Sequence, residues 1–327
     1  MSEDPSISTT GISTTGMPAR AGAALADVRA EIDLVDAALH DLLMQRTDLV
    51  ASVAAAKAAA ASQAGQGSFI ALRPGREAQV LRALAARHKG PLPLDVVFRV
   101  WREIISAKIQ LQGPFRVEVA GGDAPLGLWD LARSFYGSST EMALHDHTRQ
   151  VLQQVADDRS TLGVLPLPTL DEVDPWWPGL VGQGPQGVKV VARLPFLVRH
   201  ETDDAPEPLG AFAVAQAEYE ESGDDISLVV LRTNGPVSES ASVALLDRLG
   251  FDGVERFSVA PATGSEAAQY SLMAVGAYVT PDDPRLGGLE DGAGELALIG
   301  GYARPVDVSG ALWQMFMPGF DAPSGGV

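Results

Sequence analysis

One uninterrupted apolar periodicity near the amino terminus constrains the fold of this chain more than any other feature. Apolar residues recur at helical spacing between Leu25 and Val53, and an alanine-rich continuation extends the pattern to about Ala61 without a proline. At 1.5 Å rise per residue, about 37 residues predict a helix of roughly 55 Å. Two short helices of the same chain cannot cover it, so we expect a homodimer in which the long helices interlock.

Two shorter helices are predicted to follow. The second begins near Pro74, since proline is tolerated in a first helical turn, and runs to about His88, before GPLPLD. The third runs from about Asp95 through Leu111, and its apolar face is predicted to comprise Val97, Val100, Trp101, Ile104 and Ile105. Arg102 and Glu103 are expected to face solvent or to form pairs along the helix.

Charge divides the chain unequally. Residues 24–112 hold 11 Lys and Arg against 9 Asp and Glu, whereas residues 113–327 hold 12 against 31. The acidic second part disfavours nucleic acids and anionic membrane surfaces as partners. The positive charge lies in the helical part, where an anionic ligand would need it.

The remaining composition sets looser limits. No apolar run reaches the roughly 18 residues of a membrane span. Residues 1–22 are rich in Ser, Thr and Gly, lack the apolar core of a signal peptide and are expected to form a disordered tail. The chain has no cysteine, and His40, His88, His145 and His147 have no metal-ligand context. We therefore expect no metal, no cofactor and a cytoplasmic location.

Six polar positions on the three predicted helices form a candidate site, and they are Arg29, Arg46, Lys57, Arg76, Glu77 and Gln112. Arg46 and Lys57 share one helix face, because a separation of 11 residues leaves them only about 20° out of register. Arg29 lies about 100° round the helix from Arg46, so it can serve a site in a partner chain. Several cations, one carboxylate and one amide suit a small dianionic ligand that needs no metal and no nucleophile.

The spacing over about residues 24–112 resembles the all-helical class of chorismate mutase, a three-helix intertwined dimer. The resemblance implies that Arg29, from the partner chain, and Arg46 bind the carboxylates of chorismate. It implies that Lys57 and Gln112 flank the ether oxygen and that Glu77 engages the ring hydroxyl, so these three are the implied catalytic residues. Arg76 matches a substrate-binding arginine.

Two positions depart from the pattern of that family. Arg73 stands where some members carry an aspartate near the ring hydroxyl, and Lys108 stands where many carry a serine. Neither change removes a cation or the amide beside the ether oxygen. We therefore interpret both as substrate-binding residues that tune affinity.

The residue types fit the implied reaction. Chorismate rearranges to prephenate by a pericyclic shift, so the protein needs no acid, base or covalent intermediate. It must hold the compact diaxial conformer, which cations can do by positioning. It must also stabilise negative charge on the ether oxygen, for which Lys57 and Gln112 are suitable donors.

From Phe115 the pattern changes to alternating strands and helices. Strands are predicted at FRVEVA, at TLGVLPLP and, as a pair, at VKVVARLPFLVRH, and helices at LGLWDLARSFYG and HTRQVLQQVADD. This alternation predicts a small parallel or mixed sheet.

The order of these segments resembles a prephenate dehydratase domain. Pro168, Thr169 and Leu170 stand at the Glu-Asn-Ser motif of that family. Residues 210–212, Gly-Ala-Phe, stand at its Thr-Arg-Phe motif, so the catalytic threonine and arginine are absent. The resemblance therefore implies a degenerate α/β domain without dehydratase activity.

Residues 225–304 are expected to form strands and one helix in β-α-β-β order, closed by a strand that ends in Gly-Tyr. This order resembles the amino-acid-binding ACT domain, although GPVSES and VERFSV only approximate its ligand motifs. Binding of phenylalanine or tyrosine is one interpretation, and a scaffold or dimer contact is the other.

The predicted fold class is a multidomain protein. It comprises the tail at 1–22, an all-α chorismate mutase domain at 23–113, a dehydratase-like α/β domain at 114–212, an ACT-like α+β domain at 213–310 and a tail at 311–327. The predicted function is a chorismate mutase that supplies prephenate. Two alternatives stay open: a non-catalytic sensor that binds chorismate or docks on another shikimate-pathway enzyme, and a bifunctional mutase–dehydratase.

Overall fold

The computed structural model describes residues 25–64, 72–170, 172–184, 186–199, 209–217, 219–261, 268–289, 292 and 294–308. The side chains of residues 53–64 and the tails predicted at 1–22 and 311–327 lie outside this description. The chain divides into two compact units, residues 1–56 and 57–327, and each is described by itself. Among the described residues, none of the helices combines the length and the apolar character that a membrane crossing requires.

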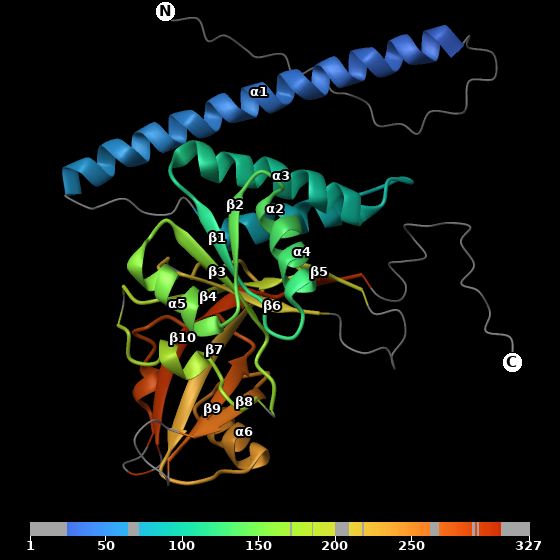
Figure 1. The fold of residues 1–327 in the computed structure, drawn as a ribbon. Helices are drawn as coiled ribbons and strands as arrows, with labels where there is room; N and C mark the ends of the chain where they lie inside the picture. The colour runs from blue at the N-terminus through green and yellow to red at the C-terminus, as the bar shows by residue number, and fades with distance from the viewer. Residues whose placement is uncertain are drawn as a thin grey trace, which may run out of the picture. The chain divides into compact units, whose positions relative to one another are not determined.

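Helix α1, Leu25–Ala64, confirms the predicted long amino-terminal helix (Figure 1). Its 40 residues correspond to roughly 60 Å at 1.5 Å per residue. Ile32, Val35, Leu39 and Leu42 form an apolar stripe along it, and each of these side chains is more than half exposed. Their alternating steps of three and four residues are the spacing of a coiled-coil seam. The stripe thus has the pattern of a surface that another helix covers.

Helices α2, Pro74–Arg87, and α3, Leu94–Gln112, also confirm their predictions, with Pro74 in the first turn of α2. The buried face of α3 differs from the one expected. Ile105 and Ile109 are buried in one cluster with residues of α4 and the sheet, whereas Val100 is 49% exposed. The face that α3 buries is therefore set by the α/β part of the chain, which the helical periodicity alone did not specify.

Within its described residues, the α/β part is organised around one mixed sheet of nine strands, in the order β2-β1-β3-β6-β4-β10-β7-β9-β8 (Figure 1). The strands are β1 Arg116–Ala120, β2 Glu141–His145, β3 Thr161–Pro166, β4 Lys189–Leu194, β6 Ala211–Ala215, β7 Asp225–Thr233, β8 Glu255–Pro261, β9 Gln269–Val275 and β10 Glu295–Ala303. A separate ribbon pairs β5, Leu197–Val198, with β11, Val306–Asp307. The prediction of a small sheet was wrong in size, because both expected α/β regions contribute to it.

Helices cover both faces of this sheet. Leu128 and Ala132 of α4, Pro125–Tyr136, pack with α3 and with the inward side chains of β1 and β3. On the other face, α5, Thr148–Asp157, packs with the 3₁₀ turn η1, Trp177–Leu180. Helix α6, Glu239–Arg248, covers β7 and β9. A second 3₁₀ turn, η2, spans Pro284–Gly287.

The two parts of the sheet join where β10 runs parallel to β4. The only paired residues there are Gly300 and Val190, next to an irregularity in β10. Gly300 has φ +118°, and a Cβ on it would lie 2.1 Å from the carbonyl oxygen of Val190. Glycine is therefore required at this seam. The domain boundary predicted at 212/213 falls inside β6, and that division stays a prediction.

Candidate functional site

The predicted site residues of α1 are placed along one continuous helix. Arg29 is exposed and Arg46 is partly exposed. Arg46 follows Leu39 by seven residues, so it continues the register of the apolar stripe. Lys57 belongs to the helical backbone of α1, but its side chain lies outside the described part of the structure.

The first turn of α2 carries two of the predicted substrate-binding arginines. Arg76 is exposed, and its Nη1 donates a long hydrogen bond of 3.4 Å to Oε1 of Gln79. Arg73 occupies the position just before Pro74, and its Nε forms an ion pair with Oε1 of Glu220, in the chain segment before β7. The structure thus joins a predicted mutase residue to the acidic half of the protein.

Glu77 lies in the interior, only 6% exposed. Its Oε2 accepts a hydrogen bond of 2.8 Å from Nη1 of Arg102, and its Oε1 accepts a long one of 3.4 Å from the backbone N–H of Arg73. The carboxylate predicted to engage a ring hydroxyl is therefore held by a cation of α3.

Arg102 was missed as a site residue, and of the two expectations for it solvent exposure was wrong, because it is buried in a pair with Glu77 of α2. It is 3% exposed, its Nε donates 2.6 Å to the carbonyl oxygen of Phe135, and its guanidinium carbon lies 3.5 Å from the centroid of the Phe135 ring. The neighbouring Tyr136 is fully buried, which raises the pKa of its hydroxyl. A signal existed in the sequence, because Arg102 is four residues after Phe98 and three before Ile105, on the buried stripe of α3.

Lys108 and Gln112 lie one turn apart at the end of α3, as predicted from their spacing. Both are partly exposed, and Nε2 of Gln112 donates 3.1 Å to the carbonyl oxygen of Lys108. This hydrogen bond orients the amide predicted to lie beside the ether oxygen.

A cleft of about 1090 Å³ lies in the α/β part. It is open where β1 and β3 end and where α4 and α5 begin, the position at which open α/β sheets commonly bind ligands. Pro168, Thr169, Leu170 and Gly210 all line it, so the structure brings together the two segments compared with the dehydratase motifs. Ala211 and Phe212 are instead buried in the sheet.

Both charge signs line this cleft. Arg149 forms an ion pair of 2.7 Å with Asp174, and both side chains are exposed. Glu172 is partly buried, and this burial raises the pKa of its carboxyl above the usual range. Arg256 reaches from β8 to donate 3.1 Å to the carbonyl oxygen of Val237, which joins the two segments compared with the ACT ligand motifs.

The comparisons with known proteins place the helical part in a family. A family model for chorismate mutase type II matches residues 28–113. The bifunctional chorismate mutase/prephenate dehydratase of Stutzerimonas stutzeri is 32% identical over 142 residues, which cover 43% of this chain and 38% of that protein. The enzyme of the same description from Pseudomonas aeruginosa is 32% identical over 143 residues, with the same coverage.

The chain thus combines an α/β part with a helical domain that matches the chorismate mutase type II family over residues 28–113. The chain spans only 38% of the length of the curated bifunctional relatives that it matches.

Solved structures superpose on this chain only loosely. GqqA, described as a novel type of quorum quenching acylase, superposes with TM-score 0.40 and 16% identity over 59% of this chain and 96% of its own. Prephenate dehydratase from Streptococcus mutans superposes with TM-score 0.38 and 12% identity over 57% of this chain and 98% of its own. TM-scores of this size assign no function to the sheet.

Proposed function

We propose that this protein is a cytoplasmic chorismate mutase, which converts chorismate to prephenate for phenylalanine and tyrosine synthesis. The observation that carries the proposal is the family match over residues 28–113, since this stretch contains every predicted site residue from Arg29 to Gln112. It holds the cations, the carboxylate and the amide that the reaction requires.

Substrate binding is assigned to the cations. Arg46 and, from the other copy, Arg29 hold the two carboxylates of chorismate, and Arg76, Arg73 and Lys108 add positive charge. Holding the diaxial conformer brings the two reacting carbons together and removes most of the entropic part of the barrier. Arg76 suits this role because it is exposed and its hydrogen bond to Gln79 is long.

Rate acceleration is assigned to Lys57 and Gln112, which donate to the ether oxygen as its negative charge develops. The carbonyl of Lys108 fixes the Gln112 amide, so little reorganisation is needed in the transition state. Glu77 keeps its proposed role toward the ring hydroxyl. Its Oε1, which accepts only a long hydrogen bond of 3.4 Å from the N–H of Arg73, would accept from the hydroxyl while Oε2 keeps its bond with Arg102.

A second copy of the chain completes this site. The exposed apolar stripe of α1 has the repeat of a helix–helix seam, and Arg46 continues its register. A homodimer that buries the stripe would also bring Arg46 to the surface that the two copies share.

The α/β part is proposed to be catalytically silent and to have a regulatory or scaffold role. Leu170 and Gly210 line the cleft at positions compared with dehydratase motif residues, and neither side chain can transfer a proton. The cleft, which Arg256 also lines, gives phenylalanine or tyrosine a place to bind.

The deciding experiment measures the loss of chorismate with the purified full-length protein, the Arg46→Ala variant and the control Arg99→Ala. Arg99 is exposed on α3, where it pairs only loosely with Asp95 at 3.8 Å. We expect turnover by the wild type and the control. Arg46→Ala should lower the activity about 100-fold or more relative to the wild type. Parallel assays with phenylalanine or tyrosine test the regulatory role.

Two outcomes lead to the alternatives. A folded dimer that binds chorismate without turnover contradicts the proposal and supports a sensor. Phenylpyruvate formed from prephenate at neutral pH contradicts the silent α/β part and supports a bifunctional enzyme.

A further inference from the structure

The segment that leads into the first residue of β7, residues 219–225, is an acidic loop of sequence YEESGDD. Hydrogen bonds within the loop fix its carboxyl-terminal end. The buried carboxylate of Asp225 accepts hydrogen bonds of 2.8 Å and 2.6 Å from the backbone N–H and the hydroxyl of Ser222, and one of 3.1 Å from the N–H of Gly223. The ring of Tyr219 is buried at the other end of the loop. The acidic loop thus has a defined conformation.

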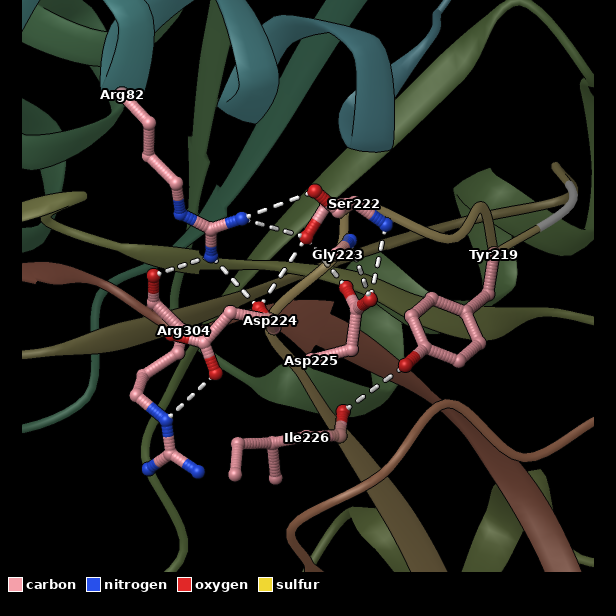
Figure 2. A network of polar contacts seen from close by, with 8 residues as sticks. All are labelled: Arg82, Tyr219, Ser222, Gly223, Asp224, Asp225, Ile226 and Arg304. Carbon is pink, nitrogen blue, oxygen red and sulfur yellow. Dashed lines mark hydrogen bonds and ion pairs between the residues drawn. The ribbon is translucent and has the colours of Figure 1, made fainter.

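Helix α2 holds this loop through Arg82 (Figure 2). Nη1 of Arg82 donates 2.9 Å to the hydroxyl of Ser222, and Nη2 donates 2.7 Å to the carbonyl oxygen of Asp224 and 2.8 Å to that of Arg304. Arg304 in turn donates 3.0 Å from Nε to Oδ1 of Asp224. The charge-assisted bonds of one guanidinium therefore join α2 to the loop and to the end of β10.

The acidic loop also touches the first turn of α2. A Cβ on Gly75 would lie 2.7 Å from the carbonyl oxygen of Glu221 and 2.8 Å from Cβ of Glu220. Only glycine permits this approach, which places the two glutamates beside the arginines of that turn. Arg73 and Arg76 line an open cavity of about 450 Å³ together with Glu220 and Glu221.

We propose that Glu220 determines the affinity of the mutase site, as a carboxylate within the chain that competes with substrate carboxylates for Arg73. This inference rests on the proposed function. The Arg73–Glu220 pair is partly exposed, with side chains 44% and 24% accessible, and pairs of this kind contribute modestly. A dianionic substrate can therefore displace Glu220, and the cost of displacement raises KM without entering the chemical step.

A purely structural role is the competing explanation. An acidic side chain near the amino end of a helix stabilises that helix through the macrodipole, whatever ligand binds elsewhere. The two roles differ in what they change, since the structural one alters thermal stability and the competitive one alters KM.

The test compares KM and kcat of the full-length wild type, Glu220→Gln and the control Glu295→Gln. Glu295 also pairs with an arginine, Arg232 at 3.4 Å, but on β10 and β7. We expect Glu220→Gln to lower KM about two- to fivefold with kcat unchanged, and Glu295→Gln to change neither. In an Arg73→Gln background, Glu220→Gln should have no further effect on KM.

An unchanged or higher KM for Glu220→Gln, in a wild type that turns over, overturns the inference and leaves the structural role. If the wild type shows no turnover, the proposed function fails separately, and chorismate titration calorimetry decides the inference by whether Glu220→Gln binds more tightly. Glu220→Asp, which keeps the charge but shortens the reach, should give an intermediate affinity and serves if the Gln variant does not fold.

Discussion

Arg102 of α3 and Glu77 of α2 form an ion pair in which both side chains are almost fully buried, with 2.8 Å between Nη1 and Oε2. The α/β part adds to this pair, because the carbonyl oxygen of Phe135 in α4 accepts a hydrogen bond from Nε of Arg102 and the Phe135 ring stacks against the guanidinium. Two charges taken out of water at this depth are tolerated only while each satisfies the other. The pair therefore makes α4 part of the environment of the mutase helices.

Removing one member of this pair should destabilise the protein strongly. We expect Arg102→Met to lower the free energy of unfolding by about 3–5 kcal/mol, because Glu77 is left buried without its counter-ion. The double variant Glu77→Leu/Arg102→Met should lose less than Arg102→Met alone. Urea unfolding of the full-length protein measures both, and Arg149→Met, which breaks an exposed pair, is the control that should change stability by less than about 1 kcal/mol. A double variant with a lower free energy of unfolding than Arg102→Met alone contradicts this account.

The join between β4 and β10 in the sheet gives a second prediction. Gly300→Ala should cost at least about 2 kcal/mol of unfolding free energy, because the new Cβ meets the carbonyl of Val190 and φ is positive. Gly287→Ala is the matched control, since nothing lies within 4 Å of its added Cβ. Chemical denaturation of both variants tests this, and equal midpoints would show that the seam tolerates a side chain.

Glu172 gives the stability a pH dependence. Burial raises the pKa of its carboxyl in the folded state, so between the unfolded and folded pKa values the folded protein binds more protons. The contribution of Glu172 is then lost as pH rises through this window. Glu172→Gln should therefore gain melting temperature relative to the wild type between about pH 4 and pH 7. A difference in melting temperature that stays constant over this range would rule out the linkage.

The local part of this fold was predictable from the sequence, and the non-local part was not. The helical spacing of the apolar residues and the helix-breaking residues located α1, α2 and α3, because each of these signals depends on neighbours within one or two turns. Strand β2 was missed, since EMALH is mostly exposed at the sheet edge and shows no alternation of burial. The join at Gly300 depends on a strand more than a hundred residues earlier in the chain, and no pattern within β10 specifies it.

The candidate site divides in the same way. The residue types, with Arg46 and Lys57 on one face of α1 and Lys108 and Gln112 on one face of α3, indicated a dianion site, because helix geometry relates positions on one helix. The partners of Arg73 and Glu77 were not predictable by this means, since Glu220 lies 147 residues from Arg73 in the sequence. Such pairing is fixed by tertiary structure alone.

The donors to the ether oxygen predict a pH-dependent rescue. Gln112→Ala and Lys57→Ala should each lower kcat by about 10²–10³-fold, the loss usual for one transition-state donor. Gln112→Glu should regain activity as pH falls through the pKa of the new carboxyl, because only its protonated form donates. Gln110→Ala is the control, since Gln110 bonds Thr140 at 2.9 Å instead. Near-normal rates for Gln112→Ala would remove the residue from the site.

Mixing two inactive variants tests whether one site draws on two chains. Arg29→Ala and Arg46→Ala should each be inactive alone, because every site in either homodimer lacks one of the two cations. If Arg29 acts across the dimer, a mixed dimer holds one site with both substitutions and one site with neither. Mixing equal amounts under conditions of subunit exchange should then restore up to about a quarter of wild-type activity, since half of the dimers are mixed and half of their sites are intact. Exchange is verified by mass spectrometry of tagged subunits, and its presence without rescue would place Arg29 and Arg46 in a site of a single chain.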